Sequence, residues 1–166
     1  ANITAKGLTI AAKASDKVYN ANTAATVTLS TKDKVEGDTL TLNKTAANFD
    51  TKNVGTGKTV TVEGLNLGGA DASNYSISNA NAKATDTADI SKAALSVSGI
   101  TSANKTYDGT TSAVLTGGSL VGVQNNEVLT LVQAGTFASA NVGTGLAVTA
   151  ADSITGATVD NYTLTQ

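Results

Sequence analysis

The sequence predicts an all-β fold built from two tandem repeats, each a small β-sandwich or β-grasp-like domain, arranged end to end. Two observations carry this prediction. Short segments alternate polar and apolar residues with a period of two, and glycine, asparagine and aspartate separate these segments. The chain also repeats its own motifs at an interval of 87 to 88 residues, and its 166 residues are enough for two small domains.

The alternating segments are the expected strands. They cover residues 26–29, 39–42, 59–62, 75–77 and 162–164, and threonine or serine occupies their polar positions. Such a strand buries one face and hydrates the other, and the branched Cβ of threonine favours extended backbone. Turns are expected at Gly37-Asp38, Gly68-Gly69, Asp108-Gly109, Gly117-Gly118 and Asn125-Asn126.

The alanine-rich stretch 70–98 is the place where a helix could compete with strands. Its apolar residues lack the spacing of three and four that an amphipathic helix needs. Its Asn, Ser and Thr side chains favour turns, because they bond to nearby main chain outside helices. We therefore expect strands and turns there, with at most one short helix in each repeat.

The internal repeat is clearest in a glycine motif. Asn53-Val54-Gly55-Thr56-Gly57 recurs 88 residues later as Asn141-Val142-Gly143-Thr144-Gly145. The six aromatic residues also form matched pairs. The residues that carry the repeat, and to which we assign a structural role, are Tyr19, Phe49, Asn53, Gly55, Gly57, Asn74 and Tyr75 in repeat 1 and Tyr107, Asp108, Gly109, Phe137, Asn141, Gly143, Gly145, Asn161 and Tyr162 in repeat 2.

The matches also set the expected domain boundaries. Ala1-Asn2-Ile3 matches Ala88-Asp89-Ile90, so residues 1–3 are expected to be the tail of a preceding repeat. Repeat 1 then covers residues 4–90 and repeat 2 covers residues 91–166. Repeat 2 has no counterpart of the segment 83–90 and is expected to lack its last strand. The natural chain is expected to extend in both directions.

The composition argues against an enzyme. The chain has no Cys, His, Met, Trp, Pro or Arg, so it can form neither a triad with an imidazole base nor a zinc site of nitrogen and sulfur ligands. The carboxylates of repeat 2 lie mostly in turn contexts, where solvated acids are common. We expect no catalytic residue, no metal and no cofactor. The net charge of −2 without a basic run argues against nucleic-acid binding, and no apolar run approaches the roughly 20 residues that span a bilayer.

Three kinds of feature admit a second interpretation. Gly55-Thr56-Gly57-Lys58-Thr59 resembles the end of a phosphate-binding loop, but Lys52 stands where that motif needs glycine, and a strand follows, so we expect a tight turn. The segments before Tyr75 and Tyr162 could offer oxygen ligands to calcium, although we favour a turn whose Tyr hydroxyl bonds to main chain. The matched Lys17 and Lys105 could form isopeptide bonds with asparagine, or could be exposed lysines.

Several of these motifs occur in one known family. Lys105-Thr106-Tyr107-Asp108-Gly109-Thr110-Thr111, the segment 53–58 and the segment 69–75 together resemble the YDG-type repeats of large bacterial surface adhesins, including filamentous-haemagglutinin-like secreted proteins. The resemblance implies an extracellular location, at the bacterial cell surface or secreted, and an adhesive parent protein. Repeat 1 departs from the pattern with Tyr19-Asn20-Ala21-Asn22, where a different turn is expected, and repeat 2 has Leu146 in place of the lysine.

These observations lead to two functional hypotheses. The first is a structural stalk or spacer that projects a binding domain from the cell surface, with neighbouring repeats of the same chain as partners. The alternative is that the repeats themselves bind host glycan, matrix protein or biofilm polysaccharide. Up to residue 87 the chain has nine Lys and eight acids, and after it two Lys and five acids, so the two surfaces differ in charge. This difference favours the first hypothesis, because a shared ligand would preserve one surface.

Overall fold

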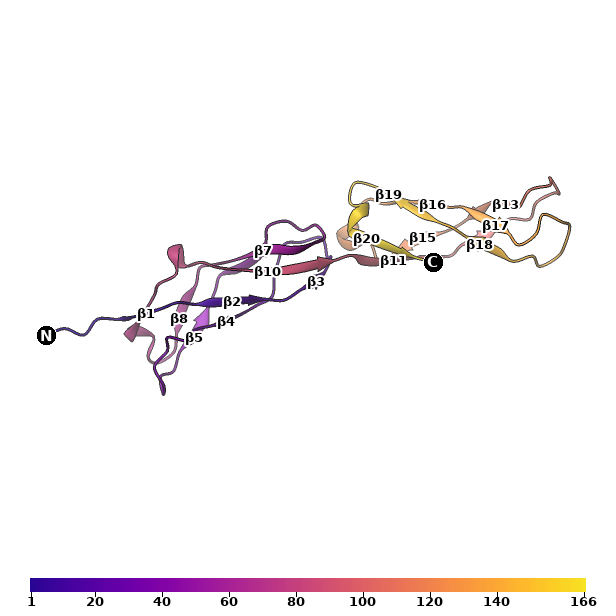
Figure 1. Cartoon of the computed structure of the whole chain (residues 1–166). Helices are drawn as coiled ribbons and strands as arrows, with labels where there is room; N and C mark the ends of the chain where they lie inside the picture. The colour runs from indigo at the N-terminus through magenta and orange to yellow at the C-terminus, as the bar shows by residue number, and fades with distance from the viewer. The chain divides into compact units, whose positions relative to one another are not determined.

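The computed structural model describes all 166 residues, which form two compact units, Ala1–Ser91 and Lys92–Gln166 (Figure 1). Both units consist of short strands joined by turns and by 3-10 turns of three residues, and neither contains an α-helix. The all-β prediction is confirmed. The structure contains no helix long and apolar enough to cross a membrane.

Unit 1 contains a four-stranded sheet and three two-stranded ribbons. Its strands are β1 (Lys6–Leu8), β2 (Ala11–Ala14), β3 (Lys17–Val18), β4 (Val27–Ser30), β5 (Thr41–Asn43), β6 (Ala46–Phe49), β7 (Gly55–Glu63), β8 (Asn66–Gly68), β9 (Tyr75–Ile77) and β10 (Ala84–Ser91). The 3-10 turns η1 (Ala72–Asn74) and η2 (Ala80–Ala82) precede β9 and β10. The ribbons are β1–β9, which is parallel, and β2–β4 and β5–β8, which are antiparallel.

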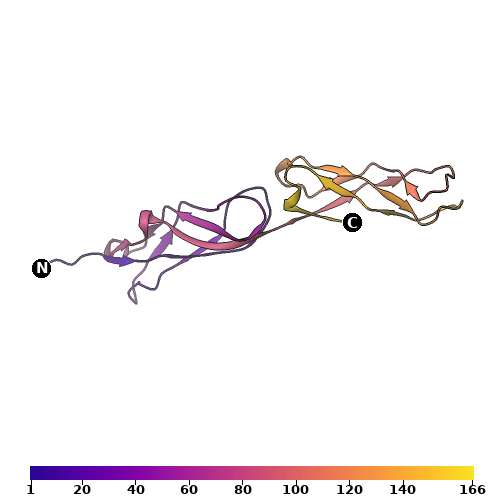
Figure 2. The ribbon, with the colours of Figure 1, turned by 45° about the horizontal axis from the view of Figure 1, so that its top comes forward.

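The four-stranded sheet has the order β3-β10-β7-β6. β10 runs antiparallel to β7 and parallel to the short β3, and both views show it beside β7 (Figures 1 and 2). The register of β10 on β7 shifts between Ala88 and Ile90. β10 is therefore an inner strand of unit 1 and connects β3 to β7, the longest strand.

The core of unit 1 follows from the alternation in β7. Val60 and Val62 are fully buried, whereas Thr59 is exposed and Thr61, between the valines, is half-buried. Val62 packs in a cluster with Ile10, Ala47 and Leu65. Burial of one such aliphatic side chain contributes roughly 1.5–3 kcal/mol. The buried residues of unit 1 are therefore mostly aliphatic, with three aromatic side chains among them.

Unit 2 has ten strands and two 3-10 turns. They are β11 (Ala93–Ser98), β12 (Thr101–Ser102), β13 (Ser112–Ala113), β14 (Leu115–Thr116), β15 (Ser119–Val121), β16 (Thr130–Val132), β17 (Gly135–Phe137), β18 (Val148–Ala150), β19 (Ser153–Thr155), β20 (Tyr162–Thr165), η3 (Gln124–Asn126) and η4 (Val159–Asn161). The sheets are β15-β11-β20 and β13-β17-β18, with the ribbons β12–β14 and β16–β19.

Several strands of the two units match. Parallel β11 and β20 correspond to parallel β1 and β9. β18 corresponds to β7, because Phe137 pairs with Val148 as Phe49 pairs with Val60. β18 pairs only with β17, and no strand of unit 2 occupies the place that β10 has in unit 1.

Most expected strands are present. Residues 59–62 lie in β7, 75–77 are β9, 162–164 lie in β20, and β4 covers 27–30. The segment 39–42 is a strand only at its last two residues, because the Thr39 main-chain N–H donates to the Asp71 carboxylate at 2.8 Å instead of entering a ladder. The stretch 70–98 holds strands and two 3-10 turns and no α-helix. Residues 1–3 lie outside the strands, and Ile3 is fully exposed.

A lysine-clamped loop as the candidate functional site

A lysine holds the loop that follows β3 in unit 1. The Lys17 ammonium donates to the Asn20 amide oxygen at 2.9 Å and to both the main-chain oxygen and the amide oxygen of Asn22 at 2.8 and 3.2 Å. It also reaches the main-chain oxygen of Ala24 at 3.0 Å. We call this group of four contacts the lysine clamp. An ammonium has three protons, so four oxygens share them.

Unit 2 repeats the lysine clamp contact by contact. The Lys105 ammonium donates to the Asp108 carboxylate at 2.8 Å and to the main-chain oxygen and hydroxyl of Thr110 at 2.8 and 2.9 Å. The fourth acceptor is the main-chain oxygen of Ser112 at 3.1 Å. Each of these residues lies 88 positions after its counterpart in unit 1. The clamp is therefore a property of the repeat, although the acceptor side chains differ.

A phenylalanine completes the clamp in both units. The lysine nitrogen lies 5.3 Å from the ring centre of Phe49 in unit 1 and 5.8 Å from that of Phe137 in unit 2. Both distances suit a cation–π contact. The Phe49 N–H donates to the Thr23 oxygen at 2.8 Å, and the Phe137 N–H donates to the Thr111 oxygen at 2.7 Å. The ring and the main chain of the phenylalanine thus both fasten the loop.

The turn inside the clamp is the same in both units. Gly109 has φ 76° and its counterpart Ala21 has φ 61°, so both lie in the left-handed region. The residue before it caps the turn: Asp108 accepts the Thr110 N–H at 2.9 Å, and Asn20 accepts the Asn22 N–H at 3.4 Å. The expectation of a different turn in repeat 1 is therefore wrong. The lysine contacts hold alanine in a conformation that glycine adopts without strain.

The clamp carries different charges in the two units. The Lys105 ammonium, followed by the Thr110 N–H and hydroxyl, lowers the pKa of Asp108 to about 2. Asn20 is neutral and leaves the Lys17 ammonium without an acidic side chain in the clamp of unit 1. Burial lowers the pKa of Lys17. The clamp is an ion pair in unit 2 and an ion–dipole network in unit 1.

The tyrosine of the motif has opposite exposure in the two units. Tyr19 is 1% exposed, and its N–H donates to the oxygen of Ser91, the last residue of β10, at 2.8 Å. The Lys52 ammonium lies 6.0 Å from its ring centre. Tyr107 is 63% exposed. The difference follows from β10, which covers Tyr19 and has no counterpart in unit 2.

The glycine motif opens β7 and lacks the loop-to-helix geometry of a phosphate-binding loop. Gly55–Glu63 is a strand and no helix begins there, so the motif is part of β7 itself and not the tight turn that was expected before the strand. Gly57 has φ 58° and donates its N–H to the Asp89 carboxylate at 2.7 Å. Lys58 pairs with Asp50 at 2.8 Å, and this contact lowers the pKa of Asp50.

The matched motif of unit 2 lies in the loop before β18. Gly145 has φ 63°, close to that of Gly57. Gly143 is exposed, and a Cβ there would lie 2.9 Å from Leu146, which shows that this leucine packs over it. Asn53 and Asn141 are both exposed, and the Asn141 N–H donates to the Ser139 hydroxyl at 3.0 Å.

The tyrosines of the last matched motif fasten a distant loop. The Tyr75 hydroxyl donates to the Asp38 carboxylate and accepts the Val35 N–H at 3.0 Å. The Tyr162 hydroxyl donates to the Glu127 carboxylate at 2.8 Å and accepts the Gln124 N–H at 3.0 Å. The expected bond between Tyr hydroxyl and main chain is confirmed. The acidic partner was not expected, and it raises the pKa of Tyr75.

The main-chain N–H groups of the asparagines before these tyrosines form hydrogen bonds within the 3-10 turns. The Asn74 N–H donates to the Asp71 oxygen and the Asn161 N–H donates to the Thr158 oxygen, both at 3.0 Å. Asn161 is buried and Asn74 is exposed. The Asp71 carboxylate binds the Thr39 N–H, and nowhere in the structure do three or more acidic side chains gather in a metal-binding group.

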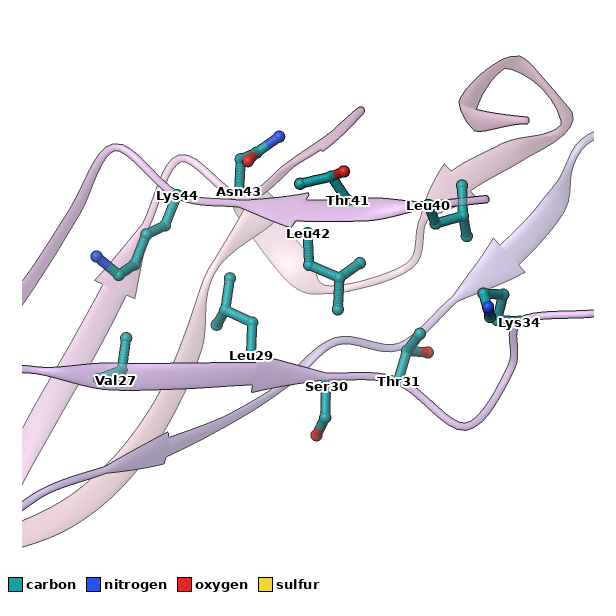
Figure 3. A pocket seen from close by; sticks show the side chains of 10 residues that line it. All are labelled: Val27, Leu29, Ser30, Thr31, Lys34, Leu40, Thr41, Leu42, Asn43 and Lys44. Atoms are coloured by element: carbon teal, nitrogen blue, oxygen red, sulfur yellow. The ribbon is translucent and has the colours of Figure 1, made fainter. Parts of the chain in front are cut away.

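Unit 1 also contains a surface groove of about 720 Å³ between β4 and β5 (Figure 3). Leu29 and Leu42 face each other across it, and Lys34 and Lys44 lie toward its two ends. In unit 2 Gln133 stands after β16 where Lys44 stands after β5, and its side chain packs over Gly118 with Leu131. Neither Lys34 nor Lys44 therefore has a lysine at the matched position of unit 2.

Comparison with known proteins gives one result. The family model described as the YDG domain matches the chain twice, over residues 4–84 and 91–166. No curated protein and no solved structure matches the chain. The two matched segments leave residues 85–90 between them, so nearly all of β10 lies outside the family match although it is an inner strand of unit 1.

Proposed function

Because the chain belongs to the YDG domain family and holds two tandem copies of that domain, we propose that it is a structural spacer of an extracellular bacterial adhesin. In this role the repeats project a separate binding domain from the cell surface, and each repeat has its neighbours in the same chain as partners. The location is extracellular, at the cell surface or secreted. The domains carry no chemistry of their own.

The proposal rests on the internal contacts that the two units share. The lysine clamp recurs contact by contact, and so does the tyrosine bond to the distant loop. These shared contacts fasten loops within one unit. The two lysines of the groove, Lys34 and Lys44, have no counterpart in unit 2, and the charges of the two halves differ. Conserved internal contacts with divergent surfaces favour a spacer over a repeated binding site.

The aromatic residues support the same interpretation. Tyr19, Phe49, Tyr75 and Tyr162 are buried and Phe137 is half-buried, so they cannot offer a platform on which sugar rings stack. Tyr107 is exposed at an edge where its counterpart in unit 1 is covered by a strand.

The spacer function predicts the dimensions of the chain in solution. Small-angle scattering should give the profile of two separate beads. A variant with a flexible Gly-Ser linker inserted between Ser91 and Lys92 is the matched control, and it should give a broader distribution of distances between the beads. A profile of one compact globule for the unmodified chain would overturn the spacer function.

The groove of unit 1 supports a second candidate function, the binding of host glycan, matrix protein or biofilm polysaccharide. Its apolar floor with Lys34 and Lys44 suits an acidic sugar polymer or an acidic protein segment. A screen against glycans and matrix proteins tests this, with an unrelated folded β-repeat as control. Saturable binding that the double change Lys34→Gln and Lys44→Gln removes without unfolding would establish the second function. Absence of binding above the control would eliminate it.

A further inference from the structure

The groove between β4 and β5 of unit 1 combines a free strand edge, an aliphatic floor and two lysines. We propose that it binds one extended acidic segment of a partner protein, which adds as a strand along the edge of β4 and places its carboxylates at Lys34 and Lys44. The proposal rests on the second candidate function, because it names the ligand of the same groove. It does not depend on the spacer function.

β4 has one free edge. Its only partner strand is β2, and no main-chain hydrogen bond joins it to β5 across the groove. The Ser15 N–H donates to the Thr26 oxygen at 3.0 Å, and Thr28 faces β2 in the same way two residues later. Successive residues of an antiparallel strand direct their main-chain groups to opposite edges. The N–H and C=O groups of Val27 and Leu29 therefore point away from β2, toward the groove.

The floor of the groove is aliphatic. Leu29 and Leu42 face each other across it (Figure 3), and both are half-buried and pack against the core of unit 1. Val27 and Leu40 also line the groove, and no aromatic side chain does. Such a floor can bury the apolar side chain of a peptide, whereas it offers a sugar ring no aromatic face. The floor therefore favours a protein segment over a sugar polymer.

The groove carries positive charge and no acid. Lys34 and Lys44 lie toward its two ends, and none of the residues that line it is aspartate or glutamate. The Lys34 ammonium donates to the Asp38 main-chain oxygen at 2.9 Å, which uses one of its three protons. Both lysines are exposed, and neither forms an ion pair. Their ammonium groups are thus available to carboxylates at the two ends of a docked segment.

These features define the residue pattern of the segment. A strand alternates its side chains between two faces, so apolar residues at alternate positions contact Leu29 and Leu42 while the polar residues between them stay in water. The stretch 40–44 lines the side of the groove opposite β4. A segment of about five residues matches that length, with one acid beyond each end. Main-chain pairing supplies affinity in strand addition, and the side-chain pattern supplies specificity.

Unit 2 differs at the matched place. Gly118 is the counterpart of Ser30, and a Cβ on this glycine would lie 2.7 Å from the Gln133 amide nitrogen and 2.9 Å from Leu131. The side chain that matches Lys44 thus lies against the main chain and carries no charge. Unit 2 therefore serves as the reference within the same molecule.

The probe is a capped peptide in which valine and threonine alternate over about five residues and glutamate stands at both ends. It is added to the full chain, and amide chemical shifts and hydrogen exchange are followed by NMR. We expect saturable shifts in unit 1, at β4 and β5, and none in unit 2. Exchange of the Val27 and Leu29 amides should slow by about tenfold or more at saturation, because these N–H groups gain acceptors. Thr28 already faces β2 and is the reference amide.

Two altered peptides are the first controls. A peptide with lysine in place of both glutamates tests the charge, and a peptide N-methylated at each residue between the glutamates tests the strand, because it has lost its main-chain donors. Both should bind more weakly than the parent peptide by about tenfold or more.

Two double variants of the chain are the second controls. Lys34→Gln with Lys44→Gln should weaken binding of the parent peptide by about tenfold or more. Lys6→Gln with Lys13→Gln removes the same charge outside the groove and should weaken it by less than about twofold, because the distant charges are screened. All four side chains are exposed, so neither double variant disturbs the core.

Three results would overturn the proposal. The first is binding of the lysine-ended or the N-methylated peptide as tight as that of the parent peptide. The second is saturable binding that leaves exchange of the Val27 and Leu29 amides unchanged. The third is binding of an acidic sugar polymer, such as polygalacturonate, that depends on Lys34 and Lys44 while no peptide binds. In that case the second candidate function stands and the protein segment is wrong, whereas binding of neither probe removes both.

Discussion

Ala21 and Gly109 adopt the same left-handed backbone conformation, with φ of 61° and 76°, at matched positions of the lysine clamp. For glycine this conformation carries no strain, whereas alanine pays roughly 1–2 kcal/mol in it. The lysine nevertheless makes the corresponding contacts around the turn in both units. The lysine therefore imposes the turn in unit 1 against the preference of the residue at its centre.

The first prediction is that Ala21→Gly stabilises unit 1. Relief of the strained conformation outweighs the larger conformational entropy of glycine in the unfolded chain, for a net gain of about 0.5–1 kcal/mol. Gly109→Ala should destabilise unit 2 by about 1 kcal/mol. No atom lies within 4 Å of the added Cβ, so the cost is conformational alone. Amide exchange in β7 and in β17 reports the two units separately. Equal stability of Ala21→Gly and the parent chain would contradict this account.

The second prediction concerns the lysine of the clamp. Lys17→Met keeps the apolar stem and removes the ammonium, so the oxygens of Asn20, Asn22 and Ala24 lose their donor. We expect a loss of about 1–2 kcal/mol from unit 1 and faster exchange of the Phe49 N–H. Lys6→Met, in β1, is the control and should leave the Phe49 amide unchanged. Unchanged exchange of Phe49 in Lys17→Met would show that the loop holds without the lysine.

The third prediction is a pH dependence of the lysine clamp in unit 2 that the clamp of unit 1 does not share. Because the pKa of Asp108 is lowered to about 2 in the folded unit, its charge stabilises unit 2 above the ordinary carboxyl pKa near 4. This contribution is lost as the pH falls from about 4 through about 2. The clamp of unit 1 has Asn20 at this position and should not titrate with it. NMR titration of the Asp108 carboxyl and of the Phe137 amide measures the effect.

Asp108→Asn is the matched control for the pH dependence. It gives unit 2 the neutral acceptor that unit 1 has at Asn20. In this variant the protection of the Phe137 amide against exchange should no longer depend on the ionisation of residue 108 between about pH 4 and pH 2. A dependence of the same size in the parent and in Asp108→Asn would assign it to another carboxyl group.

The sequence predicts the positions of the clamp but not its contacts. Lys17 and Lys105 are matched at an interval of 88 residues, as are both phenylalanines. Two of the four acceptors in each unit are main-chain oxygens. Every residue type has such an oxygen, so the sequence cannot identify these acceptors. The side-chain acceptors differ between the units, with Asn20 in unit 1 and Asp108 in unit 2. A comparison of the two repeats therefore marks this position as a mismatch and not as a shared acceptor.

Strand pairing was the other part that the sequence could not provide. Alternation identifies β7 and β9, because burial of one face is a local pattern. That β10 lies between β3 and β7 depends on contacts between residues far apart in the chain. The same holds for the acids Asp38 and Glu127, which meet Tyr75 and Tyr162 across 37 and 35 residues. Their spacing to the tyrosine differs by two residues between the repeats, which hides the match.

The fourth prediction is that the chain contains no isopeptide bond. The lysine ammonium contacts an amide oxygen in unit 1 and a carboxylate in unit 2 with the same geometry, so hydrogen bonds account for the clamp in both. The intact mass should equal the sequence mass, without loss of ammonia or water. Treatment with the protease trypsin after unfolding should release the peptide that ends at Lys17. A mass lower by one ammonia, kept after unfolding, would reveal a bond in unit 1.

The last prediction concerns the tyrosine that fastens the distant loop of unit 2. Tyr162→Phe removes the hydroxyl that accepts the Gln124 N–H and donates to Glu127, and it keeps the buried ring. A part-buried N–H then lacks this acceptor, and unit 2 should lose about 1–3 kcal/mol. Glu127→Gln keeps an acceptor for the hydroxyl and should cost less. Hydrogen exchange of the Gln124 amide measures the local effect, and the exchange rate should rise far more in Tyr162→Phe than in Glu127→Gln. The reverse order would mean that the acid, and not the main-chain contact, holds the loop.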